Sequence, residues 1–596
     1  MTAGRDRQQG WLACGPGPVI RLPERSPAEQ DHDSCALGQV RKPVGQVRKA
    51  QVSGPSAGHG RLPRRAAAHS ADLAPSPAEL RRLHRVAGGQ EDADLIVHGG
   101  TLVVVHTGEL QRRDLLIVGR FIAAVTQPGA LSARRALDAS GRYLLPAYVD
   151  ENIRVERTLL TPGELARVVV PRGTVTLLAD TSRLTALCGP RGGQLATATR
   201  TPMRLLEALP VTPAMPAAMT TMVPRQPVSL PESAGGPPLD VTGMPGAFPV
   251  GPEPDGFGPV SPSGPTFGSG SGSASGGLPV ERTADDDPWE ALLEASDGRT
   301  VIDLVVRGHL GRDVRRAVKA GMDPLTAVRM ATLAPARRHG LDHLLGSLTP
   351  THLADIQIVS EIAGPHPPEV VLSGGRLAAE RGRPLFDNLD VIPAWARERL
   401  SLPPGLHSGS FTVPAASLGS AGRAVNGVQV ILIQGEEPCV EVVMVRPAVT
   451  GGVTGCAEAD PEQNLLKVAL VTCRADQPAG TRVGFIRGIG LRQGAIAMTT
   501  SVAPGDLAII GAGDHDMMTA ARALEGMGGG FVVVDRGWVL AACPLPVAGV
   551  MSDAPWDAVR DQLDGVDAAA AALGCTLAAP FLTLAPLGQQ LYCPPS

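Results

Sequence analysis

Short hydrophobic segments that alternate with polar positions dominate the first part of the chain. DLIVHGG, TLVVVH, RDLLIVGRFIAAV and RYLLP are separated by glycines, a pattern typical of short β-strands joined by turns. Similar segments return at residues 354–359 (ADIQIV) and 369–377 (EVVLSGGRL). Because such strands lie on both sides of a long intervening region, we predict one small composite β-domain from residues 77–145 and 346–395.

In the intervening region, hydrophobic runs alternate with amphipathic segments. Residues 174–179 (TVTLLA) are rich in apolar and β-branched residues and predict the next buried strand. Residues 161–164 (TPGE) have the spacing of a capping box with proline at the first helical position, and they predict a helix over ELARVVV. Strands that alternate with helices indicate a (β/α) barrel, which we expect over residues 146–235 and 283–345.

Two more helices are predicted near the end of this region, but the region is short for a barrel. A basic amphipathic helix should follow His309 and stop at Gly321, and Asp323 should cap the next one. A closed eightfold barrel takes about 250 residues. Residues 236–282 are rich in Gly, Pro and Ser and cannot supply buried strands, so we predict a linker there and an incomplete barrel.

The last hydrophobic segments predict a separate α/β unit at residues 426–590. VQVILIQ, LLKVALV, LAIIGAG and FVVVD predict strands, and MMTAARALEGM and the segment from Trp556 predict helices. Residues 396–425 should form a linker. Residues 1–76 have no hydrophobic period and predict a disordered extension, with order beginning at the helix-like segment from Pro77. The expected fold class is therefore α/β.

Composition and charge exclude several classes of protein. The formal net charge of −4 over 596 residues gives no general electrostatic reason to bind nucleic acid or an anionic membrane. No apolar run reaches the roughly 18 residues of a membrane span. The nine cysteines form no CxxC pairs, as expected of reduced thiols in the cytoplasm. We therefore expect a cytoplasmic protein that binds neither nucleic acid nor membrane.

Several long motifs point to one known family. Residues 144–161 read LLPAYVDENIRVERTLLT, the second predicted strand lies in PRGTVTLLADTSR, and the C-terminal unit contains GFIRGIGLRQGAIA and PLPVAGVMSD. On these motifs the chain resembles the adenine deaminases of the amidohydrolase superfamily, over roughly residues 77–235 and 283–590. The resemblance implies hydrolysis of adenine to hypoxanthine and ammonia at a dinuclear manganese or iron centre.

The same resemblance shows that expected metal ligands are replaced. The family pattern PGFIDxHxH has metal-binding histidines where this chain has Asn152 and Arg154, and Arg172 replaces a histidine before the second strand. An amide oxygen is a weak ligand for a transition metal, and a guanidinium does not coordinate one. We therefore predict that the dinuclear centre is not retained and that catalysis is impaired or lost.

A few polar residues remain as candidates for a site. Glu156 still matches the family pattern and, with Asp285, is a candidate catalytic carboxylate. The remaining candidate metal ligands are Asp180, Asp285, Asp286 and His309. Each also has an ordinary structural interpretation: His309 can be a helix cap or a satisfied core histidine, and an aspartate run suits a solvated helix start.

One other cluster resembles a ligand set. Asp514, His515 and Asp516 are consecutive, but they lie between a predicted strand and a predicted helix, where aspartate is expected for structural reasons. The preceding Gly511-Ala512-Gly513 resembles a dinucleotide loop but lacks its third glycine. We therefore expect both features to be structural.

Three interpretations of function follow. The first is a family member that has lost catalysis and has a structural or partner-binding role, as a homo-oligomer or as a hetero-oligomer with an intact deaminase. The second is a working aminohydrolase with a metal site rebuilt from the residual candidates. The third is the product of a decayed gene, in which missing strands would expose apolar edges and favour aggregation.

Overall fold

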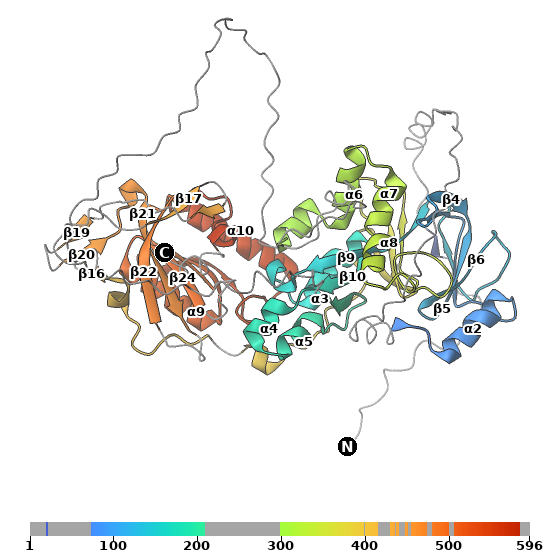
Figure 1. Cartoon of the computed structure of the whole chain (residues 1–596), viewed down its shortest axis with the longest axis horizontal. Helices are drawn as coiled ribbons and strands as arrows, with labels where there is room; N and C mark the ends of the chain where they lie inside the picture. Colours follow the sequence, from blue (N-terminus) through green and yellow to red (C-terminus); the bar gives the residue numbers. More distant parts are fainter. Residues whose placement is uncertain are drawn as a thin grey trace, which may run out of the picture. The chain divides into compact units, whose positions relative to one another are not determined.

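The chain combines strands and helices in an α/β fold with mixed sheets (Figure 1). The computed structural model describes residues 20–21, 73–208, 298–397, 400–414, 430–434, 437–439, 448–450, 455–473, 480–499 and 506–584. Within these ranges, no helix has both the length and the apolar character needed to cross a bilayer.

Two sheets form the region of the predicted composite β-domain. One has five strands (β1-β7-β2-β5-β6) and the other has seven (β15-β14-β13-β12-β8-β3-β4). In the larger sheet, β12 pairs antiparallel with β8, so strands that are far apart in sequence share one sheet. The first sheet contains β1 (Ile20–Arg21), β2 (Leu95–His98), β5 (Asp114–Val118), β6 (Phe121–Thr126) and β7 (Ala136–Asp138). The second contains β3 (Thr101–Val104), β4 (Glu109–Arg112), β8 (Tyr143–Pro146), β12 (Ile356–Val359), β13 (Val370–Ser373), β14 (Arg376–Glu380) and β15 (Arg383–Pro384).

Helix α2 (Pro77–Ala87) begins where the sequence predicts it, because Ser76 and Glu79 form a capping box at its N-terminus. The Glu79 N–H donates to Ser76 Oγ at 3.3 Å, and the Ser76 N–H donates to Glu79 Oε2 at 2.8 Å. Leu83 and Val86 are the buried residues of the helix, three positions apart, and so they lie on one face.

Several predicted segments fall outside the described residues. Of the predicted disordered extension, only Ile20–Arg21 is described before residue 73, and it pairs in parallel with β7. The predicted linker at residues 236–282 is not described, nor are residues 398–399 and 415–425 of the second predicted linker. The disorder of the N-terminal extension (residues 1–76) and the domain boundaries stay predictions.

Three parallel strands form the sheet of the predicted barrel, in the order β11-β10-β9. They are β9 (Tyr148–Ile153), β10 (Thr174–Ala179) and β11 (Arg204–Glu207). The predicted strand at 174–179 is confirmed, and all its residues are buried because the sheet is covered on both faces. Residues 209–297 are not described, so the incompleteness of the barrel stays a prediction.

Helix α3 (Pro162–Val169) confirms the helix predicted after Thr161, but the predicted capping box is wrong. The Thr161 side chain makes no cap hydrogen bond. The Glu164 carboxylate instead accepts hydrogen bonds from Asn388 Nδ2 and from the backbone N–H of Trp556, each at 3.0 Å. Trp556 begins a later helix, whose positive N-terminal end favours a carboxylate over the local cap.

The helices predicted around His309 and Asp323 are confirmed as α6 (Leu310–Lys319) and α7 (Pro324–Met330). Asp323 caps α7, because its carboxylate accepts the Thr326 N–H at 2.8 Å. The other helical elements of this region are η2 (Val155–Thr158), η3 (Val170–Arg172), α4 (Ser182–Cys188), α5 (Arg191–Thr197), η5 (Asp303–Arg307) and α8 (Leu333–Arg338).

The C-terminal unit is an eight-stranded sheet in the order β18-β17-β22-β21-β24-β23-β25-β26, next to a small sheet β16-β20-β19. The large sheet contains β17 (Val430–Gln434), β18 (Glu437–Cys439), β21 (Leu465–Thr472), β22 (Gly480–Arg487), β23 (Ala495–Thr499), β24 (Asp506–Gly511), β25 (Gly530–Asp535) and β26 (Trp538–Pro544). The small sheet contains β16 (Val413–Pro414), β19 (Ala448–Thr450) and β20 (Cys456–Glu458).

Helices α9 (Asp514–Met527) and α10 (Trp556–Ala572) cover opposite faces of the large sheet. Ala469, Val471, Ile509 and Val532 share a core with α9. Leu466, Val468, Ile510 and Val533 share a core with α10. Because these residues alternate along each strand, they point to opposite sides of the sheet. The predicted helices of this unit are thus confirmed.

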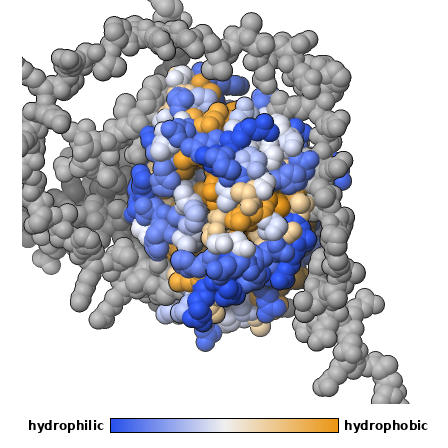
Figure 2. All heavy atoms as spheres, turned by 90° about the vertical axis from the view of Figure 1, so that its right-hand side faces the viewer, coloured by the Kyte–Doolittle hydropathy of each residue, from blue (hydrophilic) through white to orange (hydrophobic). Residues whose placement is uncertain are grey.

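Large apolar side chains are exposed at a few places in the described part of the chain. Figure 2 shows one face of the molecule, on which hydrophilic residues surround a central group of hydrophobic ones. Three consecutive residues of β26 are also exposed, Trp538 by 77%, Val539 by 47% and Leu540 by 50%. Among the described strands β26 is the last of its sheet, so these apolar residues lie on an edge strand.

Candidate functional site

The carboxyl ends of β9, β10 and β11 bring together polar residues that are far apart in sequence. Ala179 at the end of β10 is paired with Ile153 on one side and with Glu207 on the other. The residues that follow, Arg154 and Asp180, therefore lie at the same edge of the sheet. In barrels of this type, the edge at the carboxyl ends of the strands is where active sites lie.

An ion pair occupies this edge. Arg154 Nε donates a hydrogen bond to Asp180 Oδ2 at 3.0 Å, and the Ser182 N–H donates to Asp180 Oδ1 at 3.0 Å. Burial acts to raise the pKa of Asp180, but the hydrogen bonds from Ser182 and Arg154 outweigh it and hold this pKa below its ordinary value. Asp180 is therefore a carboxylate that is already paired with a cation.

Glu156 is the least satisfied polar group at this edge. Its side chain is buried, and neither carboxylate oxygen has a hydrogen-bond partner. The guanidinium of Arg183 lies 3.9 Å from Glu156 Oε1. Burial raises the pKa of Glu156, although the positive charges of Arg183 and Arg154 act in the opposite direction. A buried carboxylate with a raised pKa is an expected property of a proton-transferring group.

His309 is fully engaged in the core. Its Nε2 lies 3.0 Å from Asp150 Oδ2, and its Nδ1 lies 2.7 Å from Thr174 Oγ1. The side chains of His309 and Asp150 are completely buried. Since both ring nitrogens have protein partners, a metal ion would have to displace one of these contacts to bind the ring. This geometry matches the interpretation of His309 as a satisfied core histidine.

The structure brings together only some of the predicted site residues. Asn152 and Arg154 lie at the carboxyl end of β9, close to Asp180 in the pairing of the strands. Arg172 lies elsewhere, because it precedes β10 and thus sits at the opposite end of the strands. Asp285 and Asp286 lie outside the described residues. In the ranges that are described, no three His, Cys, Asp or Glu side chains are grouped so that they could hold a metal ion.

Three contacts of this region were not predicted from the sequence. Thr181 Oγ1 donates to Glu207 Oε1 at 3.0 Å, across β10 and β11. Arg183 approaches Glu156, and Asp150 holds His309. A signal was present for Asp150, since it is the aspartate of the motif that precedes Asn152. For Glu207 the signal was weak, because β11 contains only two consecutive apolar residues.

The Asp514–Asp516 cluster has a structural role, as predicted, but not as a set of caps. Asp514 Oδ1 accepts a hydrogen bond from Lys467 Nζ at 2.7 Å. Asp516 accepts the backbone N–H groups of Arg536, at 3.2 Å, and Gly537, at 2.7 Å. The N-cap of α9 is Gly513, so the aspartates are free to bind other elements.

Comparison with known proteins gives consistent matches. Residues 443–592 match the model of the adenine deaminase C-terminal domain, and residues 295–378 match that of the amidohydrolase family. The chain is 31% identical to an adenine deaminase of Methylobacterium nodulans, over 85% of this chain and 95% of the relative. It is 28% identical to an adenine deaminase of Desulforamulus reducens, over 85% and 93%.

Solved structures match over smaller parts. A D-hydantoinase structure is 29% identical over 15% of this chain and 20% of that chain, with a TM-score of 0.14. A zinc-bound adenosine deaminase structure from Xanthomonas campestris is 11% identical over 50% of this chain and 95% of that chain, with a TM-score of 0.29. Scores this low add nothing to the sequence matches.

Proposed function

This chain belongs to the adenine deaminase family, and from that premise we propose that it is a member that no longer deaminates adenine. The family implies a divalent metal ion, whose role in such hydrolases is to turn water into a nucleophile near neutral pH. The proposal depends on whether the residues present could hold such an ion.

The observation that carries the proposal is the ion pair of Arg154 with Asp180. A guanidinium stands at a ligand position of the family motif and is hydrogen-bonded to the carboxylate of Asp180. At about 4 Å, a guanidinium and a divalent ion would repel each other by roughly 8 kcal/mol at an effective dielectric of about 20. The described residues therefore do not fit a divalent metal centre, and we derive no catalytic step through one.

The rival proposal, a working aminohydrolase, would need a metal site rebuilt from Glu156, Asp180, Asp285 or Asp286, and His309. Two of these groups are already engaged, Asp180 by Arg154 and His309 by Asp150 and Thr174. Of the candidates that the structure describes, only Glu156, with its unbonded oxygens and raised pKa, favours a remaining chemical role. The rival is an outcome of the following experiment.

We expect the whole chain, purified with manganese or iron supplied, to contain far less than one metal ion per chain. We also expect no ammonia from adenine above the rate in buffer, because no water-activating ion is held. Elemental analysis and a coupled ammonia assay measure the two quantities. The Methylobacterium nodulans relative, treated identically, is the positive control.

The Glu156→Gln variant makes this test specific. Under the proposal, the variant and the parent chain are equally inactive, because Glu156 has no reaction to assist. Stoichiometric metal in the parent, together with ammonia release that Glu156→Gln abolishes, would establish the rival and overturn the proposal.

We further propose that the chain forms a homodimer through β26, as the non-catalytic role that its surface supports. The strand lies on a sheet edge and exposes Trp538, Val539 and Leu540. An open edge offers unpaired backbone groups to another strand, and two copies can pair around a twofold axis. An intact adenine deaminase is the other partner expected from the sequence.

We expect the Trp538→Ser/Leu540→Ser variant to shift the protein from dimer to monomer, because it removes the apolar strip but keeps the strand. Size-exclusion chromatography with light scattering measures the mass. Val391→Ser, which changes a side chain that is 74% exposed elsewhere on the surface, is the matched control and should leave the dimer intact. A parent chain that is monomeric at micromolar concentration contradicts the proposal.

A further inference from the structure

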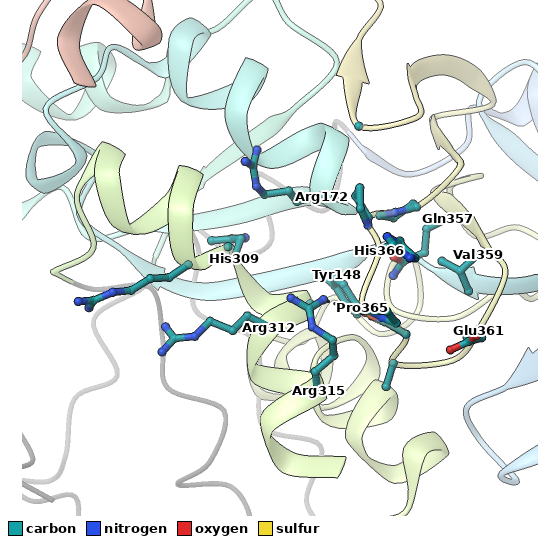
Figure 3. Close-up of a pocket in the computed structure, with 18 of the residues that line it drawn as sticks. Tyr148, Arg172, His309, Arg312, Arg315, Gln357, Val359, Glu361, Pro365 and His366 are labelled. Carbon is teal, nitrogen blue, oxygen red and sulfur yellow. Dashed lines mark hydrogen bonds between the residues drawn. The ribbon is translucent and has the colours of Figure 1, made fainter. Parts of the chain in front are cut away.

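A cavity of about 240 Å³ lies at the amino ends of β9 and β10, away from the edge that carries Arg154 and Asp180. Tyr148, the first residue of β9, and Arg172, just before β10, contribute to its wall. Arg312 and Arg315 of α6 and the loop at residues 363–368 line it as well (Figure 3). The cavity is thus separate from the candidate catalytic edge.

The charge of this cavity is unbalanced. Within the part of the chain that is described, no carboxylate forms an ion pair with Arg172, Arg312 or Arg315. Arg307, at the rim, is paired with Asp303 at 3.1 Å. Glu361 is the one carboxylate among the lining residues that are described, and Figure 3 shows it on the far side of Arg315 from Arg312.

The arginines are held in place but keep donors to spare. Arg172 donates to the carbonyl oxygens of Val168 and Val305, which fix its position and use two of its five N–H groups. Arg315 makes one long hydrogen bond, of 3.5 Å, to the carbonyl oxygen of Gly364. Arg312 and Arg315 are three residues apart on α6 and so share a face of the helix.

We propose that this cavity binds the phosphate group of a small phosphate monoester. Arginine suits phosphate because its planar guanidinium donates two parallel hydrogen bonds to it. A phosphate monoester carries up to two negative charges, so it neutralises more of the charge of Arg172, Arg312 and Arg315 than a carboxylate with one negative charge does. Burial lowers the pKa of Arg172, so a bound anion would also relieve an unfavourable charge. Tyr148, Val305 and Pro365 supply an apolar wall for the organic part of the ligand.

The size of the cavity limits the ligand. Pockets for drug-sized molecules enclose about 300–1,000 Å³, and this one is smaller. A phosphorylated three-carbon compound is therefore a suitable probe. The proposal does not rest on the loss of deaminase activity, because the cavity lies at the other end of the strands.

The test is isothermal titration of the whole chain with glycerol 3-phosphate, inorganic phosphate and glycerol. We expect glycerol 3-phosphate to bind, inorganic phosphate to bind more weakly and glycerol not to bind. Arg315→Gln and Arg312→Gln should each weaken binding of glycerol 3-phosphate about tenfold, the effect of one lost charge-assisted hydrogen bond. Arg316→Gln, which changes the exposed neighbour on the same helix, should leave the affinity unchanged.

Folding of each variant is checked by circular dichroism and by its melting temperature without ligand. The side chain of Arg312 makes no hydrogen bond within the described residues, so Arg312→Gln breaks none and should fold. Arg172→Gln, by contrast, removes two hydrogen bonds to backbone carbonyl groups, and the test does not depend on it. Absence of binding by glycerol 3-phosphate, or binding that Arg312→Gln and Arg315→Gln leave unchanged, would overturn the site. Tighter binding of inorganic phosphate would overturn the monoester as its ligand.

Discussion

His309→Leu should lower the free energy of unfolding by about 3–5 kcal/mol, the cost of taking the facing partner away from a buried carboxyl group. Asp150 and His309 are both fully buried, and their side chains meet at 3.0 Å. Leucine fills much of the space but leaves Asp150 without this partner and Thr174 without the ring nitrogen at 2.7 Å. Urea denaturation of the whole chain without added metal measures the change.

Two further variants separate this explanation from others. Asp150→Asn in the His309→Leu background should recover part of the loss, because it removes the buried charge. His343→Leu changes an exposed histidine and should alter stability by less than about 0.5 kcal/mol. If His309→Leu is harmless without metal but abolishes stabilisation by manganese, His309 is a metal ligand and the proposed inactivity is wrong.

Strands and helices with a strong local pattern were predictable from the sequence. β10 (TVTLLA) combines apolar residues with β-branched threonines, and α7 carries Asp323 and Pro324 at its start, so neither depends on distant residues for its identity. β11 and β22 were missed for the opposite reason. β11 has only two apolar residues, and β22 (GTRVGFIR) includes glycine and arginine, so their strand character comes from pairing with neighbours.

The candidate site shows where sequence reasoning stops. Replacement of the histidines by Asn152 and Arg154 could be read from the motif, but the partner of Arg154 could not. Asp180 reaches Arg154 only because β9 and β10 pair in a parallel register that places Ile153 beside Ala179. For Arg172 the motif was misleading. The motif grouped Arg172 with the replaced metal ligands, whereas Arg172 precedes β10 and so lies at the opposite end of the strand from Asp180.

Glu164 is a further example of a local signal that tertiary contacts override. Its position after Thr161 fits a capping box, yet its carboxylate binds the start of α10, which is 392 residues away in sequence. Nothing in the spacing of TPGE distinguishes a carboxylate that bonds its own helix from one that bonds another. The helix was predictable because proline and the apolar period fix it, but the cap was not.

Asp514→Ala should lower the free energy of unfolding by about 3 kcal/mol, because it leaves a buried lysine with one partner fewer. Lys467 of β21 is completely buried, and its Nζ donates to Glu458 Oε2 at 2.9 Å and to Asp514 Oδ1 at 2.7 Å. The ammonium thus ties β20 and the start of α9 to the large sheet. Chemical denaturation of the whole chain measures the loss.

Replacing the lysine should lower the free energy of unfolding less than replacing Asp514 does, and the difference between the two losses is the test. Lys467→Met removes the charge but keeps an unbranched apolar stem, and water can reach Asp514 and Glu458, whose side chains are 22% and 39% exposed. We expect a loss of only about 1 kcal/mol, and Lys467→Met/Asp514→Ala should be more stable than Asp514→Ala alone. Lys319→Met, at an exposed lysine, is the matched control. A larger loss for Lys467→Met than for Asp514→Ala would show that the two carboxylates repel each other and that the ammonium chiefly neutralises them.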